Sequence, residues 1–268
     1  MLLDGLKRLL HEPPPAMAFE ISEAGIAAAR IGSRAELEFR PLKPGVLAVS
    51  PLKENIVDPD EFYTVVRALA AAQGTRKRRD VTLILPDFAT RTAVLDFDEF
   101  PADPKEQLSL VRFRLKRSVP FDVEAAAVGY WAQQRTGKQC DVVVVMTPLE
   151  IIARYEAPFR AVGMNPGFVT ASALAALELA PDAGLSVLAK ITGRALTVLV
   201  RQNSIVKLVR CLEVPSADWE DIAAVLFTCD RKPDSSIVAE AEEQGIALLS
   251  TSLTTFEAAG KLWEAGLR

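Results

Sequence analysis

The chain has 268 residues, of which 50% are hydrophobic and 25% are charged, and its formal net charge is −4. This composition predicts one large or two modest globular domains and argues against a disordered chain. An acidic chain of this kind lacks the basic footprint that nucleic-acid binding requires. His11 is the only histidine, so triad or histidine-based acid–base chemistry is not expected. Three widely spaced cysteines form no metal motif and are typical of reduced thiols in the cytoplasm.

Leucines recur at helical spacing in the first ten residues. They predict a short amphipathic helix over 2–10, and a proline-rich linker follows up to residue 16. Such a helix can dock on its own domain, on a partner helix or on a membrane surface, and these alternatives stay open. No apolar run reaches the roughly 20 residues of a spanning helix, and the N-terminal segment lacks the features of a signal peptide. The sequence therefore predicts a cytoplasmic protein, with peripheral membrane association through residues 2–10 as one alternative.

The next part of the chain mixes strand and helix patterns. Asp58-Pro59 is typical of a helix start, because aspartate caps the first turn and proline suits the first helical position. The predicted helices are 58–73 and 105–117. The predicted strands are two within 17–31 around a turn at 22–25, and then 46–50, 81–86, 92–97 and 126–133.

The segment CDVVVVM at 140–146 is apolar almost throughout, which predicts a central strand buried on both faces. A helix is expected from Thr147-Pro148 to about residue 161, with Gly163 as its C-terminal cap. After a short strand, a helix is predicted over 171–179. A strand meander is predicted at 185–191, 195–202 and 204–214, with turns at 192–194 and 203. The remaining predictions are helix 218–227, strand 236–238, a further helix, strand 246–250 and helix 254–265. Together they predict a mixed-sheet α/β architecture.

Two features together resemble one family. The strand–turn–strand segments FEISEAGIAAARI (19–31) and LAKITGRALTVLV (188–200) open the two halves of the chain. Between them, residues 85–179 run from a strand ending in Leu-Pro through an acidic linker to a helix that ends in Val-Pro-Phe. Next come a strand, the apolar strand, a helix after TPLE, the turn AVGM and a helix rich in Ala and Leu. This order, over about residues 17–214, resembles PilM-like proteins, the actin-like cytoplasmic components of type IV pilus machines. The cytoplasmic domain of the type II secretion protein GspL shares the plan.

The resemblance implies an α/β, actin-like (ribonuclease H-like) two-lobed fold with mixed sheets, a small inserted subdomain and a shortened second lobe. The first lobe would span 17–183, with the insertion at about 85–168, and the second lobe would span 184–268. The tail over 234–267 also resembles the end of DRTGG-type domains, which are small regulatory modules. A regulatory module therefore stays open as an alternative for the C-terminal part.

The actin-like fold holds ATP between two hairpins, each with an Asp that orders Mg²⁺ and a glycine turn that approaches phosphate. Here Lys190 stands where the second Asp would be, and a lysine cannot hold Mg²⁺. Glu20 could still hold a metal, but Glu23 follows in the turn, where phosphate would meet negative charge. No Gly-Gly pair, which covers the adenosine in the family, occurs in the chain. The positions of this degenerate ATP cradle are Glu20, Ser22, Gly25, Lys190, Thr192 and Gly193.

These departures predict a protein that is not an enzyme, with no catalytic residues, no metal and no resident cofactor. The chain also lacks the nucleophile-elbow, zinc-protease, Walker and dinucleotide motifs. Binding of ATP with Mg²⁺, in an actin-like ATPase of a pilus or type II secretion system, stays open as the alternative.

PilM-like proteins bind the short cytoplasmic N-terminal peptide of PilN, a single-span membrane protein, in a groove beside the inserted subdomain. The resemblance implies the same class of partner here, the pilus motor ATPase as a further partner, and a location at the inner face of the inner membrane. A groove for an extended peptide needs apolar pockets and free backbone groups of a strand. The candidate residues are Phe19, Pro120 and Phe121, although Phe121 can equally be a core aromatic. The leading expectation is thus a scaffold of the pilus assembly platform.

Overall fold

The computed structural model describes residues 15–30, 36–72, 79–134, 138–179, 184–213, 224–227, 235–244 and 247–250, together with 252 and 261. The helix expected over 2–10 lies outside these residues. The chain divides into two compact units, Met1–Glu213 and Val214–Arg268, which are described separately. In the part of the chain that is described, none of the helices is long and apolar enough to cross a membrane.

A five-stranded sheet organises the first unit, in the order β3-β2-β1-β4-β8. Its strands are β1 (Met17–Ser22), β2 (Gly25–Arg30), β3 (Glu36–Pro41), β4 (Arg79–Leu85) and β8 (Met164–Ala171). β2 is antiparallel to β1 and to β3, whereas β4 is parallel to β1 and β8 is parallel to β4. This is the strand order of a ribonuclease H-like lobe, and the predicted fold class is confirmed.

The third strand of this sheet is not where the sequence predicted it. Residues 46–50 form no strand and contribute only an isolated bridge between Leu47 and Ile56. β3 occupies Glu36–Pro41 instead and is exposed along most of its length. Because an edge strand with little burial shows no apolar run, its pattern was missed. The apolar residues near Val46 are buried by loop packing rather than by strand pairing.

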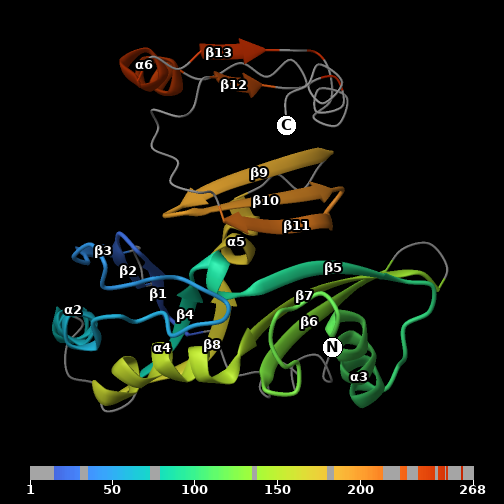
Figure 1. Ribbon diagram of the computed structural model, residues 1–268, viewed down its shortest axis with the longest axis horizontal. Coiled ribbons are helices and arrows are strands. Elements are labelled where there is room, and N and C mark those ends of the chain that lie inside the picture. Colours follow the sequence, from blue (N-terminus) through green and yellow to red (C-terminus); the bar gives the residue numbers. More distant parts are fainter. Residues whose placement is uncertain are drawn as a thin grey trace, which may run out of the picture. The chain divides into compact units, whose positions relative to one another are not determined.

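Two helices cover the apolar side of this sheet (Figure 1). In α2 (Pro59–Ala72) the Asp58 carboxylate accepts the backbone N–H of Glu61 at 3.0 Å, which confirms the predicted cap. α4 (Leu149–Ala161) buries Tyr155 and Phe159, and Gly163 follows it with φ +77° as predicted. The helix expected over 171–179 is only the four-residue α5 (Ser172–Ala175), because the backbone then tightens into a 3-10 turn, Ala176–Leu179.

The insertion is a three-stranded antiparallel sheet, β5-β7-β6, with α3 (Pro104–Leu115) against one face. Its strands are β5 (Arg91–Phe97), β6 (Ala126–Gln134) and β7 (Cys140–Pro148). β7 is central, and Val142, Val143 and Val144 are fully buried, which confirms the prediction for this strand. α4 and β8, which also fall within the predicted bounds 85–168, pack with the five-stranded sheet.

The meander predicted after residue 184 is confirmed as β9 (Leu185–Thr192), β10 (Ala195–Gln202) and β11 (Ile205–Glu213). Its turns contain Gly193 and Asn203, with φ of +54° and +48°. Leu199, Val206 and Val209 pack with Val143 of the insertion. The side chain of Gln133 donates to the Val206 carbonyl at 3.0 Å and accepts the Val206 N–H at 2.8 Å. This apolar packing and these two hydrogen bonds hold the insertion against β11.

In the second unit, β12 (Ala224–Phe227) is parallel to β13 (Ala247–Ser250), and α6 (Ser235–Gln244) lies between them in the chain. Strand β13 matches the prediction. The helix predicted over 218–227 is wrong at 224–227, and the strand predicted at 236–238 is wrong, because Ile237 and Val238 lie in α6. Short apolar runs do not distinguish a buried strand from a helical face. The helix expected over 254–265 falls almost entirely outside the described residues, and the lobe boundary at 183/184 stays a prediction.

Candidate functional site

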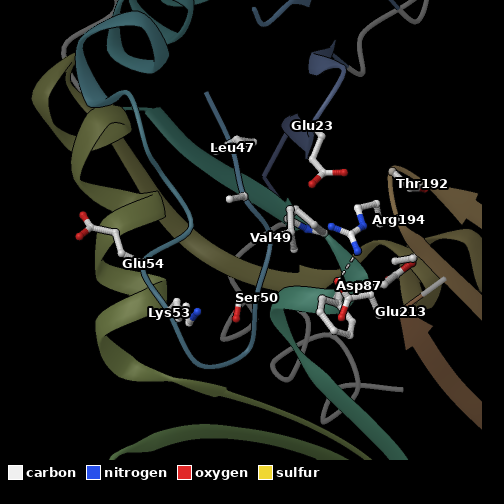
Figure 2. Close-up of a pocket in the computed structure, with 14 residues that line it drawn as sticks. Glu23, Leu47, Val49, Ser50, Lys53, Glu54, Asp87, Thr192, Arg194 and Glu213 are labelled. Atoms are coloured by element: carbon white, nitrogen blue, oxygen red, sulfur yellow. Dashed lines mark ion pairs between the residues drawn. The ribbon is translucent and has the colours of Figure 1, made fainter. Parts of the chain in front are cut away.

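The two hairpin turns face a common cleft of about 400 Å³ in the first unit. Figure 2 shows Glu23 from the β1–β2 turn, Arg194 from the β9–β10 turn and Asp87 pointing toward the same space. Asp87 belongs to a 3-10 turn, Asp87–Ala89, that directly follows β4 and Pro86. The loop Leu47–Ser50 forms the opposite wall. This is the place where the resemblance implies a nucleotide.

Lys190 occupies the centre of a polar cluster beside this cleft. Its ammonium group lies 3.3 Å from Asp87 Oδ2 and 3.7 Å from Glu20 Oε1. The side chain of Asp87 is 5% exposed and that of Lys190 is 21% exposed, so water screens this interaction weakly. Ser172 Oγ donates to Glu20, and the Ala173 N–H donates to Asp87 Oδ1 at 2.6 Å. A protein cation thus lies between the two carboxylates, where a bound metal ion would otherwise be expected.

A row of side chains across β9, β10 and β11 completes the cluster. Lys190 and Cys211 are the direct cross-strand neighbours of Thr197. Thr197 Oγ1 donates to Asp87 Oδ2 at 3.1 Å. Burial raises the pKa of the Cys211 thiol, and Asp87 raises it further, against the opposing effects of Thr197, Arg91 and Lys190. The thiol is therefore kept protonated rather than activated as a nucleophile.

The glycines of the two hairpins lie against other groups of the chain. A Cβ on Gly25 would lie 2.3 Å from the carbonyl oxygen of Arg40, so this glycine lets β3 approach closely. Ser22 Oγ donates to the Gly25 carbonyl at 3.0 Å, across the hairpin turn. At Gly193, the place of a Cβ is taken by the carboxylate of Glu23. The glycine of the second turn therefore faces a carboxylate of the first turn.

The cleft is poorly suited to Mg²⁺ and ATP. Four acidic and two basic side chains line it, namely Glu23, Glu54, Asp87, Glu213, Lys53 and Arg194. Arg194 is paired with Glu213 at 3.4 Å, and Glu54 with Arg154 of α4 at 3.1 Å. A triphosphate would meet the unfavourable charge of Glu23, and Mg²⁺ would have to displace Lys190. The residues present do not fit this cofactor.

Asn55 fixes the loop that walls the cleft. It is 1% exposed, and its side-chain amide donates to the carbonyls of Ser50 and Lys53 at 2.8 and 2.7 Å. Its Oδ1 accepts the Ser50 N–H at 3.2 Å and the hydroxyl of Tyr155 at 3.0 Å. Burial, and secondarily Glu23, raises the pKa of Tyr155, which keeps the hydroxyl a donor. The loop is thereby tied to α4.

A second, more apolar concavity lies between α4 and the insertion. One pocket of about 570 Å³ is lined on the helix by Leu149, Ile152 and Ala153, and on the insertion by residues 127–129 of β6. A neighbouring pocket of about 440 Å³ is also lined by Leu149, together with Leu52 and Phe121. Because Leu149 lines both, we call the two pockets together the α4 groove. β6 is an edge strand of its sheet, so one side of its backbone carries no neighbouring strand.

The three residues expected to bind a partner are not brought together. Phe121 lines the α4 groove and also packs against the core of the insertion, and Pro120 is exposed beside it. Phe19 is fully buried and packs on Phe159, with the ring centroids 5.0 Å apart. It lies in β1, which is paired on both sides, so neither its side chain nor its backbone is open to a partner.

The sequence predicted that Glu20 and Lys190 belong to one site. It did not predict that Asp87, Ser172 and Thr197 join them there. One signal was present for Asp87: it follows the apolar strand β4, and ligand-facing polar groups commonly follow the carboxyl ends of parallel strands. Thr197 and Ser172 had no comparable signal. Among the described residues, no group of three or more His, Cys, Asp or Glu side chains is placed to hold a metal ion.

No protein-family model matches the chain, and no curated protein matches it. Similar solved structures include the cytoplasmic domain of EpsL, an inner membrane component of the type II secretion system of Vibrio cholerae. It is 15% identical, with a TM-score of 0.47, over 78% of this chain and 80% of that one. A Bacteroides thetaiotaomicron protein with an actin-like ATPase fold and unknown function is 9% identical, with a TM-score of 0.45, over 88% and 90%. The ethanolamine utilization protein EutJ from Carboxydothermus hydrogenoformans is 11% identical, with a TM-score of 0.40, over 78% of this chain and 56% of that one.

Proposed function

We propose that this chain is a nucleotide-independent scaffold of an inner-membrane assembly platform of the type IV pilus or type II secretion kind. The observation that carries the proposal is the position of Lys190 between Glu20 and Asp87. The ammonium group of Lys190 offsets the charge of one of the two carboxylates and lies within reach of both, so no metal ion is needed to hold them close together. The resemblance of residues 85–179 to PilM-like proteins supports the platform assignment.

In this proposal the scaffold lies at the cytoplasmic face of the inner membrane. It binds the extended N-terminal peptide of a PilN-like membrane protein in the α4 groove, and the motor ATPase is a further partner. The apolar lining from Leu149, Ile152 and Phe121 and the open edge of β6 support an extended peptide as the occupant. Side chains of such a peptide fill alternate pockets while its backbone pairs with a strand edge.

Calorimetric titration tests the proposal. The titrant is a synthetic peptide with the cytoplasmic residues that precede the membrane span of a PilN-like protein. We expect saturable binding whose affinity is the same with and without ATP and Mg²⁺. Absence of binding would contradict the scaffold.

Thermal unfolding with millimolar MgATP tests the nucleotide site separately. A ligand that binds only the folded state raises the melting temperature when its concentration exceeds its Kd. We expect no increase. A magnesium-dependent increase would favour the actin-like ATPase instead.

A further inference from the structure

The outer face of α3 carries exposed cations around a projecting phenylalanine. Val111 and Leu115 point into the core of the insertion. On the opposite face, Lys105, Ser109, Phe113 and Lys116 follow one another at helical spacing. The side chain of Phe113 is 74% exposed, although a phenyl group normally finds apolar cover.

This face is basic on an acidic chain, although Glu106 is also exposed on it. Four of the six residues from 112 to 117 are Arg or Lys, whereas the whole chain has a net charge of −4. Arg112 pairs with Glu124 at 2.6 Å, and Arg114 lies 3.6 Å from Asp96. Within the described part of the chain, Lys105, Lys116 and Arg117 have no ion-pair partner. Their charge is therefore available to a partner outside the chain.

A hollow of about 460 Å³ lies beside Phe113. Its hydrogen-bond donors come from Ser109, Arg112 and Lys116, and its apolar wall comes from Leu108 and Val123. Glu124 also lines the hollow and is paired with Arg112. Donors next to apolar surface match a phosphate group that is joined to a hydrocarbon chain.

We propose that this surface, which comprises Lys105, Leu108, Ser109, Arg112, Phe113, Lys116 and Arg117 and is called the α3 face below, binds an anionic lipid bilayer. Phe113 enters the boundary between headgroups and acyl chains, and the cations lie at the level of the lipid phosphates. A protein partner fits less well, because a protein interface has a contiguous apolar core, whereas a single aromatic ring projects here among charges. The proposal adds a contact to the membrane location proposed above and does not involve the α4 groove.

Co-sedimentation of the full chain with lipid vesicles tests the α3 face. Vesicles of equal parts phosphatidylglycerol and phosphatidylcholine should bind the chain, and added salt should weaken the binding steeply. Vesicles of phosphatidylcholine alone should bind far less. Lys116→Gln should weaken binding about 5-fold, because each basic residue near an anionic surface contributes about 1 kcal/mol. Phe113→Ser should weaken it about 10-fold through the loss of apolar insertion.

Arg67→Gln is the matched control, because Arg67 is exposed on α2 and this substitution, like Lys116→Gln, removes one positive charge. It should leave vesicle binding unchanged. The proposal is overturned if the chain does not bind anionic vesicles, or if it binds both kinds of vesicle equally. It is also overturned if Lys116→Gln and Phe113→Ser bind like the unmodified chain, which would assign binding to another segment. If Lys116→Gln and Phe113→Ser instead lose binding of the PilN-like peptide but still bind vesicles, the α3 face is a protein interface. The peptide titration described above fails or succeeds independently of these outcomes.

Discussion

The cleft between the two hairpins and the α4 groove are both concave, but their linings differ. In the cleft, several of the charged residues already have ion-pair partners: Asp87 pairs with Lys190, and Arg194 with Glu213. In the α4 groove, the apolar residue Leu149 is 53% exposed. Polar groups that already have partners gain little from a ligand, because the ligand must replace existing interactions. Exposed apolar surface gains free energy from any well-fitting occupant. This contrast favours the α4 groove, rather than the cleft, as the surface that binds a partner.

The largest effect is expected for Lys190→Met. The substitution leaves Asp87 buried without its cation, while the hydrogen bonds from Ala173 and Thr197 remain. Removing one partner of a buried pair leaves an uncompensated charge, so the free energy of unfolding should fall by about 3 kcal/mol. Urea unfolding followed by circular dichroism measures this change.

Arg194→Met is the matched control for this comparison. Arg194 and Glu213 line the same cleft, but their side chains are 62% and 49% exposed. Exposed ion pairs are screened by water, so the loss should be below about 1 kcal/mol. Equal losses in the two variants would mean that Lys190 is no more than a surface cation.

A smaller effect is expected from filling the groove with Ala153→Trp. Ala153 is exposed on α4 and lines the larger pocket, so an indole there would occupy the space of the peptide. Binding of the PilN-like peptide should weaken at least about 10-fold, and the melting temperature should stay unchanged. Calorimetric titration and thermal unfolding give the two measurements.

Ala157→Trp provides the control, because Ala157 is exposed one turn further along α4 and lines neither pocket of the groove. It should bind the peptide normally. If both tryptophan variants bind normally, the peptide site lies elsewhere.

The smallest effect is expected for Tyr155→Phe, which removes one hydrogen bond to Asn55. The cost near neutral pH should be about 1 kcal/mol. Burial raises the pKa of Tyr155 above its ordinary value, so the folded state keeps the phenol protonated while the unfolded chain ionises it above about pH 10. The stability that the tyrosine adds should therefore be present below that pH and decline above it.

Unfolding curves from neutral pH to above the ordinary tyrosine pKa test this. The stability difference between the unmodified chain and the variant should shrink as the solution becomes more alkaline. A difference that stays constant across this range would mean that the phenol ionises as easily in the folded state as in the unfolded one.

Much of the first unit was predictable from local signals. The Asp58-Pro59 cap, the apolar strand at 140–146 and the turn at Gly193 each follow from short-range chemistry, and the structure has them where expected. β3 was missed, because it has little burial, and residues 236–238 of α6 were predicted as a strand, because their apolar run resembles one. The weakest predictions thus concern segments whose burial is decided by distant parts of the chain.

The sequence by itself indicated, through the resemblance, that Glu20 and Lys190 stand where the actin-like fold has aspartates, because residue identity and hairpin pattern are local properties. The order of strands and helices predicted a mixed-sheet α/β architecture, and the resemblance implied the actin-like fold class. Only the tertiary structure decided that Lys190 lies between Glu20 and Asp87, and that Glu23 faces Gly193. These contacts join residues 103 to 170 positions apart, and their geometry depends on how β9–β11 pack against the five-stranded sheet. Tertiary packing also decided that Phe121 lines the α4 groove and that Phe19 is buried.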